Sequence, residues 1–187
     1  LFDEAAFRSN DLGLRDRLRG HWPGTELAYA LKANYMPPIL HALASMQGSA
    51  EVVSRFEYEV ARQFIPGERI TFNGPVKRSE DLRVALQAGS QVNLDSFAEI
   101  DCLRQLSGEF NRLRIGLRLC FPSSQLSSRF GFEVEGVELE QALKELAAIK
   151  GVELVSLHAH ATCRPLGVED PVNRVRQLCE LSRSLLP

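Results

Sequence analysis

The segment Tyr29-Ala30-Leu31-Lys32-Ala33-Asn34 places a single lysine at the end of a short apolar run. An ammonium group is costly to bury unless it is paired, neutral or used covalently. Small residues on both sides of Lys32 leave room for another molecule to lie against its amine. A desolvated lysine amine is a nucleophile that forms Schiff bases with carbonyl compounds. The alternative is a strand-end lysine whose amine simply extends into water.

Polar residues recur after each of six short apolar runs of the chain. They are Lys32-Ala33-Asn34, Ser54 with Glu57, Asn73 to Lys77, Asn93 to Ser96, Arg118, and His158-Ala159-His160. Each set has a simple structural explanation, such as a helix cap, a turn or a histidine satisfied in the core. If the runs are strands of a parallel barrel, however, all six sets lie at the C-terminal rim, where the active sites of such barrels are built.

The two histidines of the last set, His158 and His160, lie two residues apart and so share a face if the segment is a strand. Such a pair could be half of a metal site. No H-E-x-x-H motif or matching carboxylate cluster accompanies it, so we expect no metal. Stacking of a histidine on a flat cofactor ring is the preferred interpretation.

The spacing of apolar residues alternates between the strand and helix periods along the chain. Strands are predicted at Leu27–Leu31, Glu51–Ser54, Arg69–Phe72, Gln91–Leu94, Leu113–Leu119 and Glu153–Leu157. Helices are predicted around Ile39–Met46 and Tyr58–Phe64, between Ser79 and Gly89, and at Phe97–Leu106, Val137–Ile149 and Asp170–Leu186. We expect Ser96 to cap the helix that begins at Phe97, with Glu99 completing a capping box.

This alternation predicts an α/β protein built from βα units with a parallel sheet. The regular spacing of the early strands, and the absence of GxGxxG and GxxxxGK[ST] motifs, favour a barrel over a doubly wound sheet. A (β/α)8 barrel needs eight strands and about 250 residues. With about six βα units, residues 1–187 are expected to form an incomplete TIM barrel.

Composition excludes several classes of protein. With 187 residues, 44% hydrophobic and 25% charged, the chain has an ordinary soluble composition. A net charge of -2 without a basic stripe argues against nucleic acid or a membrane surface as partner. Neither a membrane span nor a signal peptide is recognised. The four cysteines form no CxxC or zinc spacing, so a cytoplasmic location is expected.

Seven motifs occur together in one order. They are Y-A-L-K-A-N, E-V-V-S-x-x-E, F-N-G-P-x-K, N-L-D-S-x-x-E, L-R-L, S-R-F-G-F and L-H-A-H. In this order and spacing the chain resembles the fold-type III pyridoxal-phosphate decarboxylases, the group of the diaminopimelate and ornithine decarboxylases. The resemblance runs from about Phe2 to the C-terminus and implies a barrel of the alanine racemase-like type. It also implies pyridoxal 5'-phosphate as the cofactor.

The resemblance assigns roles to particular residues. Lys32 resembles the lysine that covalently holds the cofactor, and His160 resembles the histidine that stacks on its ring. Arg129 resembles a basic residue that reaches a second subunit, which implies a homodimer with shared active sites. Further cofactor-binding or substrate residues are implied at Glu51, where the family usually has aspartate, and at Ser54, Glu57, Arg118 and Cys163. Asn73 and Asp95 lie at rim positions with less certain roles.

The chain departs from the family at His160-Ala161-Thr162-Cys163, where the family has H-x-G-S. Threonine replaces a glycine that lets the backbone approach closely, and cysteine replaces a serine that is a good phosphate donor. The family's glycine-rich phosphate loop, the acidic partner of the pyridine nitrogen and the C-terminal β-domain are not found in residues 1–187. We therefore expect that this chain is part of a longer protein and has no turnover by itself.

The resemblance implies a decarboxylase of an amino-acid substrate, with diaminopimelate as the default. The altered segment from His160 to Cys163 also suits a specialised relative that acts on a siderophore or polyamine precursor. Two alternatives remain. One is a pyridoxal-phosphate-dependent racemase, which shares the barrel and the lysine, although the motifs around Asp95 and Arg129 argue against it. The other is a catalytically silent homologue that acts as a binding protein.

Overall fold

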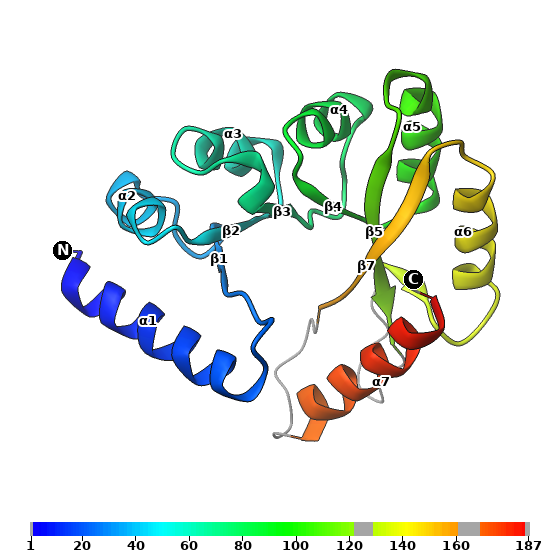
Figure 1. Cartoon of the computed structure of the whole chain (residues 1–187). Coiled ribbons are helices and arrows are strands. Elements are labelled where there is room, and N and C mark those ends of the chain that lie inside the picture. Colours follow the sequence, from blue (N-terminus) through cyan, green and yellow to red (C-terminus); the bar gives the residue numbers. More distant parts are fainter. Residues whose placement is uncertain (1, 122–128, 161–168, 186–187) are drawn as a thin grey trace. The chain divides into compact units, whose positions relative to one another are not determined.

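The computed structural model describes residues 2–121, 129–160 and 169–185 of the chain. The chain folds into two compact units. The first unit comprises Leu1–Phe72 and Ala88–Ser90, and the second comprises Asn73–Gln87 and Gln91–Pro187. Most of the helices and strands of both units are labelled in Figure 1.

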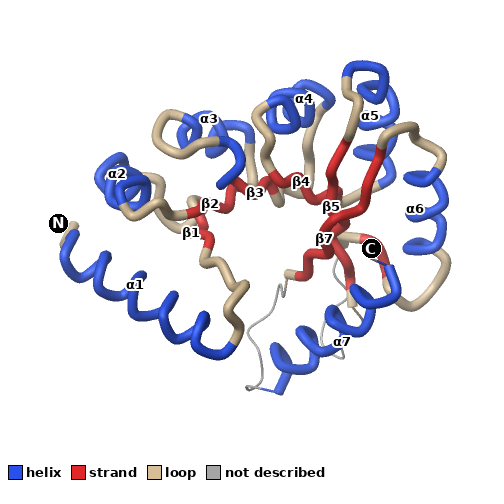
Figure 2. Tube along the Cα trace, in the orientation of Figure 1, coloured by secondary structure: helices blue, strands red, loops and turns tan. Residues whose placement is uncertain are grey.

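The first unit alternates helices with short parallel strands. Its elements are α1 (Glu4–His21), β1 (Ala28–Ala30), α2 (Pro37–Ser45), β2 (Ser49–Val52), α3 (Arg55–Arg62), the 3-10 turn η1 (Gly67–Arg69) and β3 (Ile70–Phe72). β2 pairs in parallel with β1 on one side and with β3 on the other. Within this unit α2 and α3 lie along one side of the three strands (Figure 2). The apolar side chains of these helices are buried against the strands, Leu40, Leu43 and Ala61 completely.

The second unit continues the pattern around a long central strand. Its elements are α4 (Ser79–Gln87), β4 (Gln91–Leu94), α5 (Phe97–Leu106), the 3-10 turn η2 (Ser107–Glu109), β5 (Leu113–Cys120), β6 (Phe132–Glu133), α6 (Glu138–Ala147), β7 (Val152–Ala159) and α7 (Glu169–Leu185). β5 pairs in parallel with β4, β6 and β7. The register brings Leu117 opposite Leu94 and Leu157, and Arg118 opposite His158. In this unit too the strands run parallel and are connected mostly by helices, as the sequence predicts.

Two elements are absent from the sequence prediction, α1 and β6. The apolar stripe of α1 is weak because charged residues interrupt it. The buried side of this helix carries an ion pair between Asp11 and Arg15. β6 is only two residues long and is recognisable only through its pairing with the end of β5. Both elements depend on contacts that a local pattern does not contain.

The predicted capping box at α5 is wrong in its partners. Ser96 is the N-cap residue, but its side chain makes no capping hydrogen bond. Oε2 of Glu99 instead accepts the backbone N–H of Asp95 at 2.7 Å, one residue earlier than a capping box requires. At α3 one half of the box forms, since Ser54 Oγ accepts from Glu57 N at 3.2 Å. There Glu57 Oε2 accepts from Val53 N at 2.9 Å.

Position 116 of β5 has room only for glycine, because polar side chains lie directly against its backbone. A Cβ at this position would lie 1.9 Å from Asn93 Oδ1 and 2.1 Å from Ser156 Oγ. We expect Gly116→Ala to lower the free energy of unfolding by about 1–3 kcal/mol, since both polar side chains must move. Urea unfolding measures this effect. Gly108→Ala is the control, because a Cβ there has open space around it; equal effects of the two substitutions would contradict the argument.

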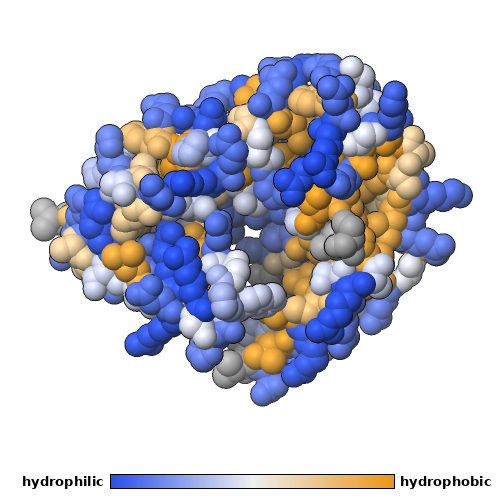
Figure 3. Space-filling view, viewed as in Figure 1, coloured by the Kyte–Doolittle hydropathy of each residue, from blue (hydrophilic) through white to orange (hydrophobic). Residues whose placement is uncertain are grey.

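The exposed surface is mixed in character. In Figure 3 apolar side chains gather over the part of the second unit where β7 lies. All eight residues of β7 are only half-buried. None of the helices in the described part of the chain has the length and apolarity that crossing a membrane requires.

Candidate functional site

Lys32 lies in the turn that follows β1, as the strand prediction requires. Leu31 is fully buried, and its backbone N–H donates to the carbonyl of Glu51 on β2 at 2.9 Å. The N–H of Ala33 donates to the carbonyl of Ala30 at 3.1 Å, which closes the turn. Lys32 itself is exposed. Leu31 occupies the buried position beside it, and the assignment of Lys32 as a Schiff-base lysine stays a prediction.

Three other residues assigned from the sequence lie near β2 in the same unit. Glu51 is half-buried on β2, opposite Ala30 of β1. Ser54 and Glu57 make the two hydrogen bonds at the start of α3 described above. These bonds give both residues a structural role at the helix N-terminus. Because that role accounts for their side chains, a role toward a ligand stays a prediction for Ser54 and Glu57.

In the second unit, Arg118 and Asp95 form a buried ion pair at the ends of β5 and β4. Nη1 of Arg118 donates to Oδ2 of Asp95 at 2.6 Å, and each residue is only 6% exposed. The other carboxylate oxygen, Oδ1 of Asp95, accepts the backbone N–H of Gly131 at 3.0 Å. Asp95 thus joins the arginine of β5 to the segment that carries Arg129.

A second buried ion pair adjoins the first. Nζ of Lys77 lies 2.9 Å from Oε2 of Glu99, and each residue is 2% exposed. Lys77 Nζ also donates to the carbonyl of Gly74, and the Lys77 N–H donates to Oε1 of Glu99 at 2.8 Å. Burial lowers the pKa of Lys77 and raises the pKa of Glu99, and the attraction between the two groups opposes both shifts. We call Lys77, Asp95, Glu99 and Arg118 the rim cluster.

The pairing within the rim cluster is not predictable from the local sequence. The pattern places Lys77 and Asp95 at the rim without a partner, and it predicts that Glu99 caps α5. The sequence carries one signal, because Lys77 and Glu99 are the last residues of the motifs F-N-G-P-x-K and N-L-D-S-x-x-E. Only the folded structure shows that the two side chains meet 22 residues apart along the chain.

Arg129 is exposed and lies beside Phe130. The guanidinium carbons of Arg129 and Arg118 lie 4.9 Å and 5.1 Å from the centroid of the Phe130 ring. Both arginines therefore make cation–π contacts with one ring. Because Arg129 is exposed, its charge is accessible to another molecule.

His158 and His160 lie at the end of β7, and their ring centroids are 6.4 Å apart. His160 is exposed, whereas Nδ1 of His158 is buried and has no hydrogen-bond partner among the described residues. Burial, with the nearby positive charges of Arg118 and His160, lowers the pKa of His158 to about 4. His158 is therefore neutral at physiological pH.

The lowered pKa of His158 predicts a dependence of stability on pH. The folded state resists protonation of a group that takes up a proton near pH 6.5 when unfolded, so stability is present above pH 6.5 and is lost as the pH falls toward 4. We expect this loss to be at most about 3 kcal/mol. Urea unfolding at several pH values should show a smaller loss in His158→Gln, while His21→Gln, at an exposed histidine of α1, should match the parent protein. Parallel pH profiles of the parent and His158→Gln would contradict the expectation.

Asn73, the other rim residue named from the sequence, belongs to a network of neutral polar side chains. Its Oδ1 accepts from Nδ2 of Asn93 at 2.6 Å. Oδ1 of Asn93 in turn accepts from Ser156 Oγ at 2.7 Å, and Gln91 Nε2 donates to the same hydroxyl at 2.9 Å. This network links β4 to β7 across Gly116.

Cys163 and Thr162, which were singled out in the sequence, lie outside the described residues. Within the described residues, no group of three or more His, Cys, Asp or Glu side chains is arranged to hold a metal ion.

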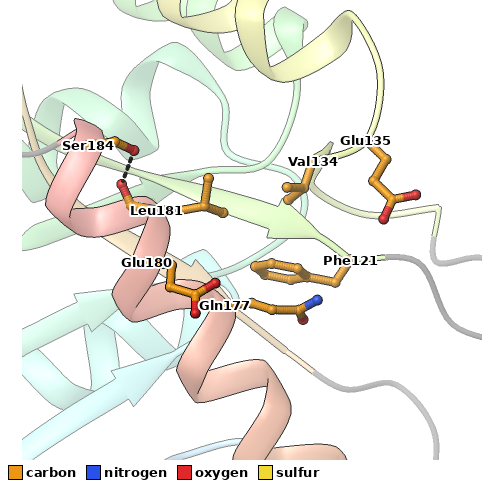
Figure 4. Close-up of a pocket in the computed structure, with 7 residues that line it drawn as sticks. All are labelled: Phe121, Val134, Glu135, Gln177, Glu180, Leu181 and Ser184. Atoms are coloured by element: carbon orange, nitrogen blue, oxygen red, sulfur yellow. Dashed lines mark hydrogen bonds between the residues drawn. The ribbon is translucent and has the colours of Figure 1, made fainter.

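A cavity of about 320 Å³ opens elsewhere in the second unit, between α7, the end of β5 and the segment after β6 (Figure 4). It is lined by Phe121, Val134, Glu135, Gln177, Glu180, Leu181 and Ser184. Oγ of Ser184 donates to the carbonyl of Leu181 at 2.9 Å. The lining contains none of the residues predicted to bind a cofactor, so the cavity is not the candidate site.

Comparison with known proteins assigns the chain to a family. The family model described as "Pyridoxal-dependent decarboxylase, pyridoxal binding domain" matches residues 15–185. The chain therefore belongs to the pyridoxal-dependent decarboxylases and carries their pyridoxal binding domain. The family predicted from the motifs is confirmed, and with it pyridoxal phosphate as the cofactor.

The relatives are considerably longer than this chain. A diaminopimelate decarboxylase of Aquifex aeolicus is 25% identical over 180 residues, which are 89% of this chain and 42% of that protein. A Staphylococcus aureus enzyme, named as the decarboxylase of a substituted 2-hydroxybutanedioate, is 27% identical over 147 residues, which are 73% of this chain and 36% of that protein. The chain thus spans less than half of each.

The fold agrees with this assignment. The crystal structure of diaminopimelate decarboxylase from M. jannaschii in complex with L-lysine superposes with a TM-score of 0.81 at 23% identity. The superposition covers 96% of this chain and 45% of that structure. The predicted fold class, a TIM barrel of which this chain contains part, is confirmed.

The described side chains suit the chemistry of pyridoxal phosphate, which combines an aldehyde with an anionic phosphate and an aromatic ring. Lys32 offers an accessible amine to the aldehyde. In the second unit, Arg118 carries a positive charge, and the buried Nδ1 of His158 is available for a hydrogen bond. The residues present therefore fit the cofactor of the family.

Proposed function

We propose that the protein carrying this chain is a pyridoxal-phosphate-dependent amino-acid decarboxylase of the diaminopimelate type. The observation that carries the proposal is the family match over residues 15–185, which includes Lys32 after β1 and His160 after β7. The proposals on activity, substrate and partner extend this match to the whole protein.

In this function Lys32 would hold the cofactor covalently through its amine. When bound, the cofactor would supply an electron sink for the carbanion left by loss of carbon dioxide. His160 offers a flat, exposed ring that suits stacking on the cofactor. By resemblance, further contacts to the cofactor would come from Arg118, Glu51, Ser54 and Cys163, and Glu57 would contact the substrate or the second subunit.

For the substrate, we propose a carboxylated amine, with diaminopimelate as the first candidate. The replacement of Gly-Ser by Thr162-Cys163 supports a specialised substrate, such as a siderophore or polyamine precursor. The Staphylococcus aureus relative, whose name gives it a bulky carboxylated substrate, is consistent with such a change.

We further propose a cytoplasmic homodimer in which Arg129 reaches the second subunit. The exposed guanidinium of Arg129 and the free thiols of Cys102 and Cys179 support these two assignments. The remaining strands of the barrel and a C-terminal β-domain would then belong to a longer protein, and residues 1–187 alone would have no turnover.

The test is a titration of the intact protein with pyridoxal phosphate, followed by assays of carbon dioxide release and of racemisation. The panel contains meso-diaminopimelate, lysine, ornithine and carboxylated siderophore intermediates. Cofactor binding with carbon dioxide release from one of them supports the proposal. Cofactor binding with racemisation alone would identify a racemase, and absence of cofactor binding would identify a silent homologue.

A further inference from the structure

The rim cluster forms a continuous chain of hydrogen bonds within the second unit. It begins at the segment after β3, where both the backbone and the side chain of Lys77 bind Glu99. Glu99 binds the N–H of Asp95 after β4. Asp95 binds Arg118 at the end of β5 and the N–H of Gly131. One connected network of hydrogen bonds therefore joins the ends of β4 and β5 to the segments that contain Lys77 and Gly131.

Every oxygen of the two carboxylates in the cluster accepts at least one donor. Oε1 of Glu99 accepts one backbone N–H, and Oε2 accepts another together with the amine of Lys77. Each oxygen of Asp95 accepts one donor. Carboxylates that are buried and engaged in this way are poorly suited to exchange protons with a substrate, but they hold their donors in fixed orientations.

Arg118 is the member of the cluster with unused capacity. A guanidinium has five N–H donors in a rigid fork, and among the described residues the hydrogen bond to Asp95 uses one of them. Across the β5–β7 register, Arg118 is opposite His158, whose buried Nδ1 has no partner among the described residues. The position of the fork determines where its remaining donors point, and that position is set by Asp95.

Buried ion pairs are often no more stabilising than apolar residues of the same size. Stability alone therefore does not explain the two buried ion pairs of the rim cluster. We infer that Asp95 is a positioning residue that orients the guanidinium of Arg118 toward bound pyridoxal phosphate, and that Glu99 with Lys77 positions Asp95. The inference rests on the proposed function. It assigns roles to Lys77, Asp95 and Glu99 that the motif resemblance leaves open.

The test compares Asp95→Asn with Asp11→Asn in the intact protein. Both substitutions neutralise the acidic member of a buried Asp–Arg pair, and Asp11 with Arg15 lies on α1 in the first unit. We expect both variants to lose stability, while Asp95→Asn alone weakens pyridoxal phosphate binding by about tenfold and changes the absorption or circular dichroism of the bound cofactor. Equal cofactor affinity and spectra in the two variants would overturn the inference.

Arg118→Lys keeps the positive charge but removes the fork. We expect it to weaken cofactor binding to a similar extent, and the double variant with Asp95→Asn to be little weaker than either single variant, because the two residues act together. Additive losses would show that Asp95 acts independently of Arg118 and would overturn the inference.

A measurement without substitutions covers the case in which the variants do not fold. Hydrogen exchange in the parent protein follows the amides of Lys77, Asp95 and Gly131, each of which donates to a carboxylate of the cluster. Binding of pyridoxal phosphate should slow all three, and it should leave the Ala6 amide, which donates to Asp3, unchanged. Cofactor binding without any change at the three amides would contradict the inference, whereas failure of the parent protein to bind the cofactor would count against the proposed function.

Discussion

Lys32→Ala is expected to abolish covalent attachment of pyridoxal phosphate and to reduce decarboxylation by roughly 10²–10⁴-fold or more, the range lost with a positioned acid–base group. The amine of Lys32 is exposed after β1, where an aldehyde can reach it. Alanine cannot form the Schiff base and cannot return protons to the product. The measurement is the absorption spectrum of the intact protein with the cofactor, together with mass spectrometry after borohydride reduction.

Lys144→Ala is the matched control for this prediction. Lys144 is exposed on α6, as Lys32 is exposed after β1, but it does not follow a strand of the sheet. We expect the control to keep both the spectrum and the activity of the parent protein. If the reduced cofactor is attached to a peptide without Lys32, the assignment of this residue is wrong.

Glu99→Leu is expected to lower the free energy of unfolding by about 3–5 kcal/mol, the range for removing one partner of a buried ion pair. The substitution leaves the amine of Lys77 buried without its carboxylate and removes the acceptor of two backbone N–H groups. Because those two N–H groups stay without an acceptor, the double variant Lys77→Met/Glu99→Leu should recover only part of the loss. Denaturant unfolding at neutral pH measures both variants.

The control for Glu99 is Glu153→Leu. Glu153 pairs with Arg112 near the surface, where both side chains are partly exposed. Exposed pairs contribute about 1 kcal/mol or less, so this variant should lose far less stability than Glu99→Leu. If the two losses are equal, burial does not decide the contribution of the Lys77–Glu99 pair.

The predictable parts of the fold are those that depend on local pattern. β4 and α5 occur at the predicted residues, Gln91–Leu94 and Phe97–Leu106, because apolar spacing and flanking polar residues mark both ends. The predicted strand at Glu51–Ser54 instead begins at Ser49, and Ser54 serves as the N-cap of α3. Strand limits depend on pairing with the neighbouring strand, which the local sequence does not specify.

In the candidate site, too, the local sequence predicts some features and the folded structure decides others. The motifs locate Lys32, Arg118 and His160 after β1, in β5 and after β7, because a residue at a strand end is determined by its place in an alternating pattern. They do not show that Lys32 is exposed. That outcome depends on Leu31, which fills the buried position and is held by a hydrogen bond to β2.

The amino-acid sequence by itself determined the family and the order of βα units, since these follow from residue types, motifs and spacing, and it predicts Lys32 as the lysine that forms a Schiff base. Only the tertiary structure decided how the charges at the strand ends are paired. Glu99 binds Lys77 and Asp95 rather than capping α5, and Asp95 holds Arg118, because folding brings side chains from separate segments into a buried place where each charge needs a partner.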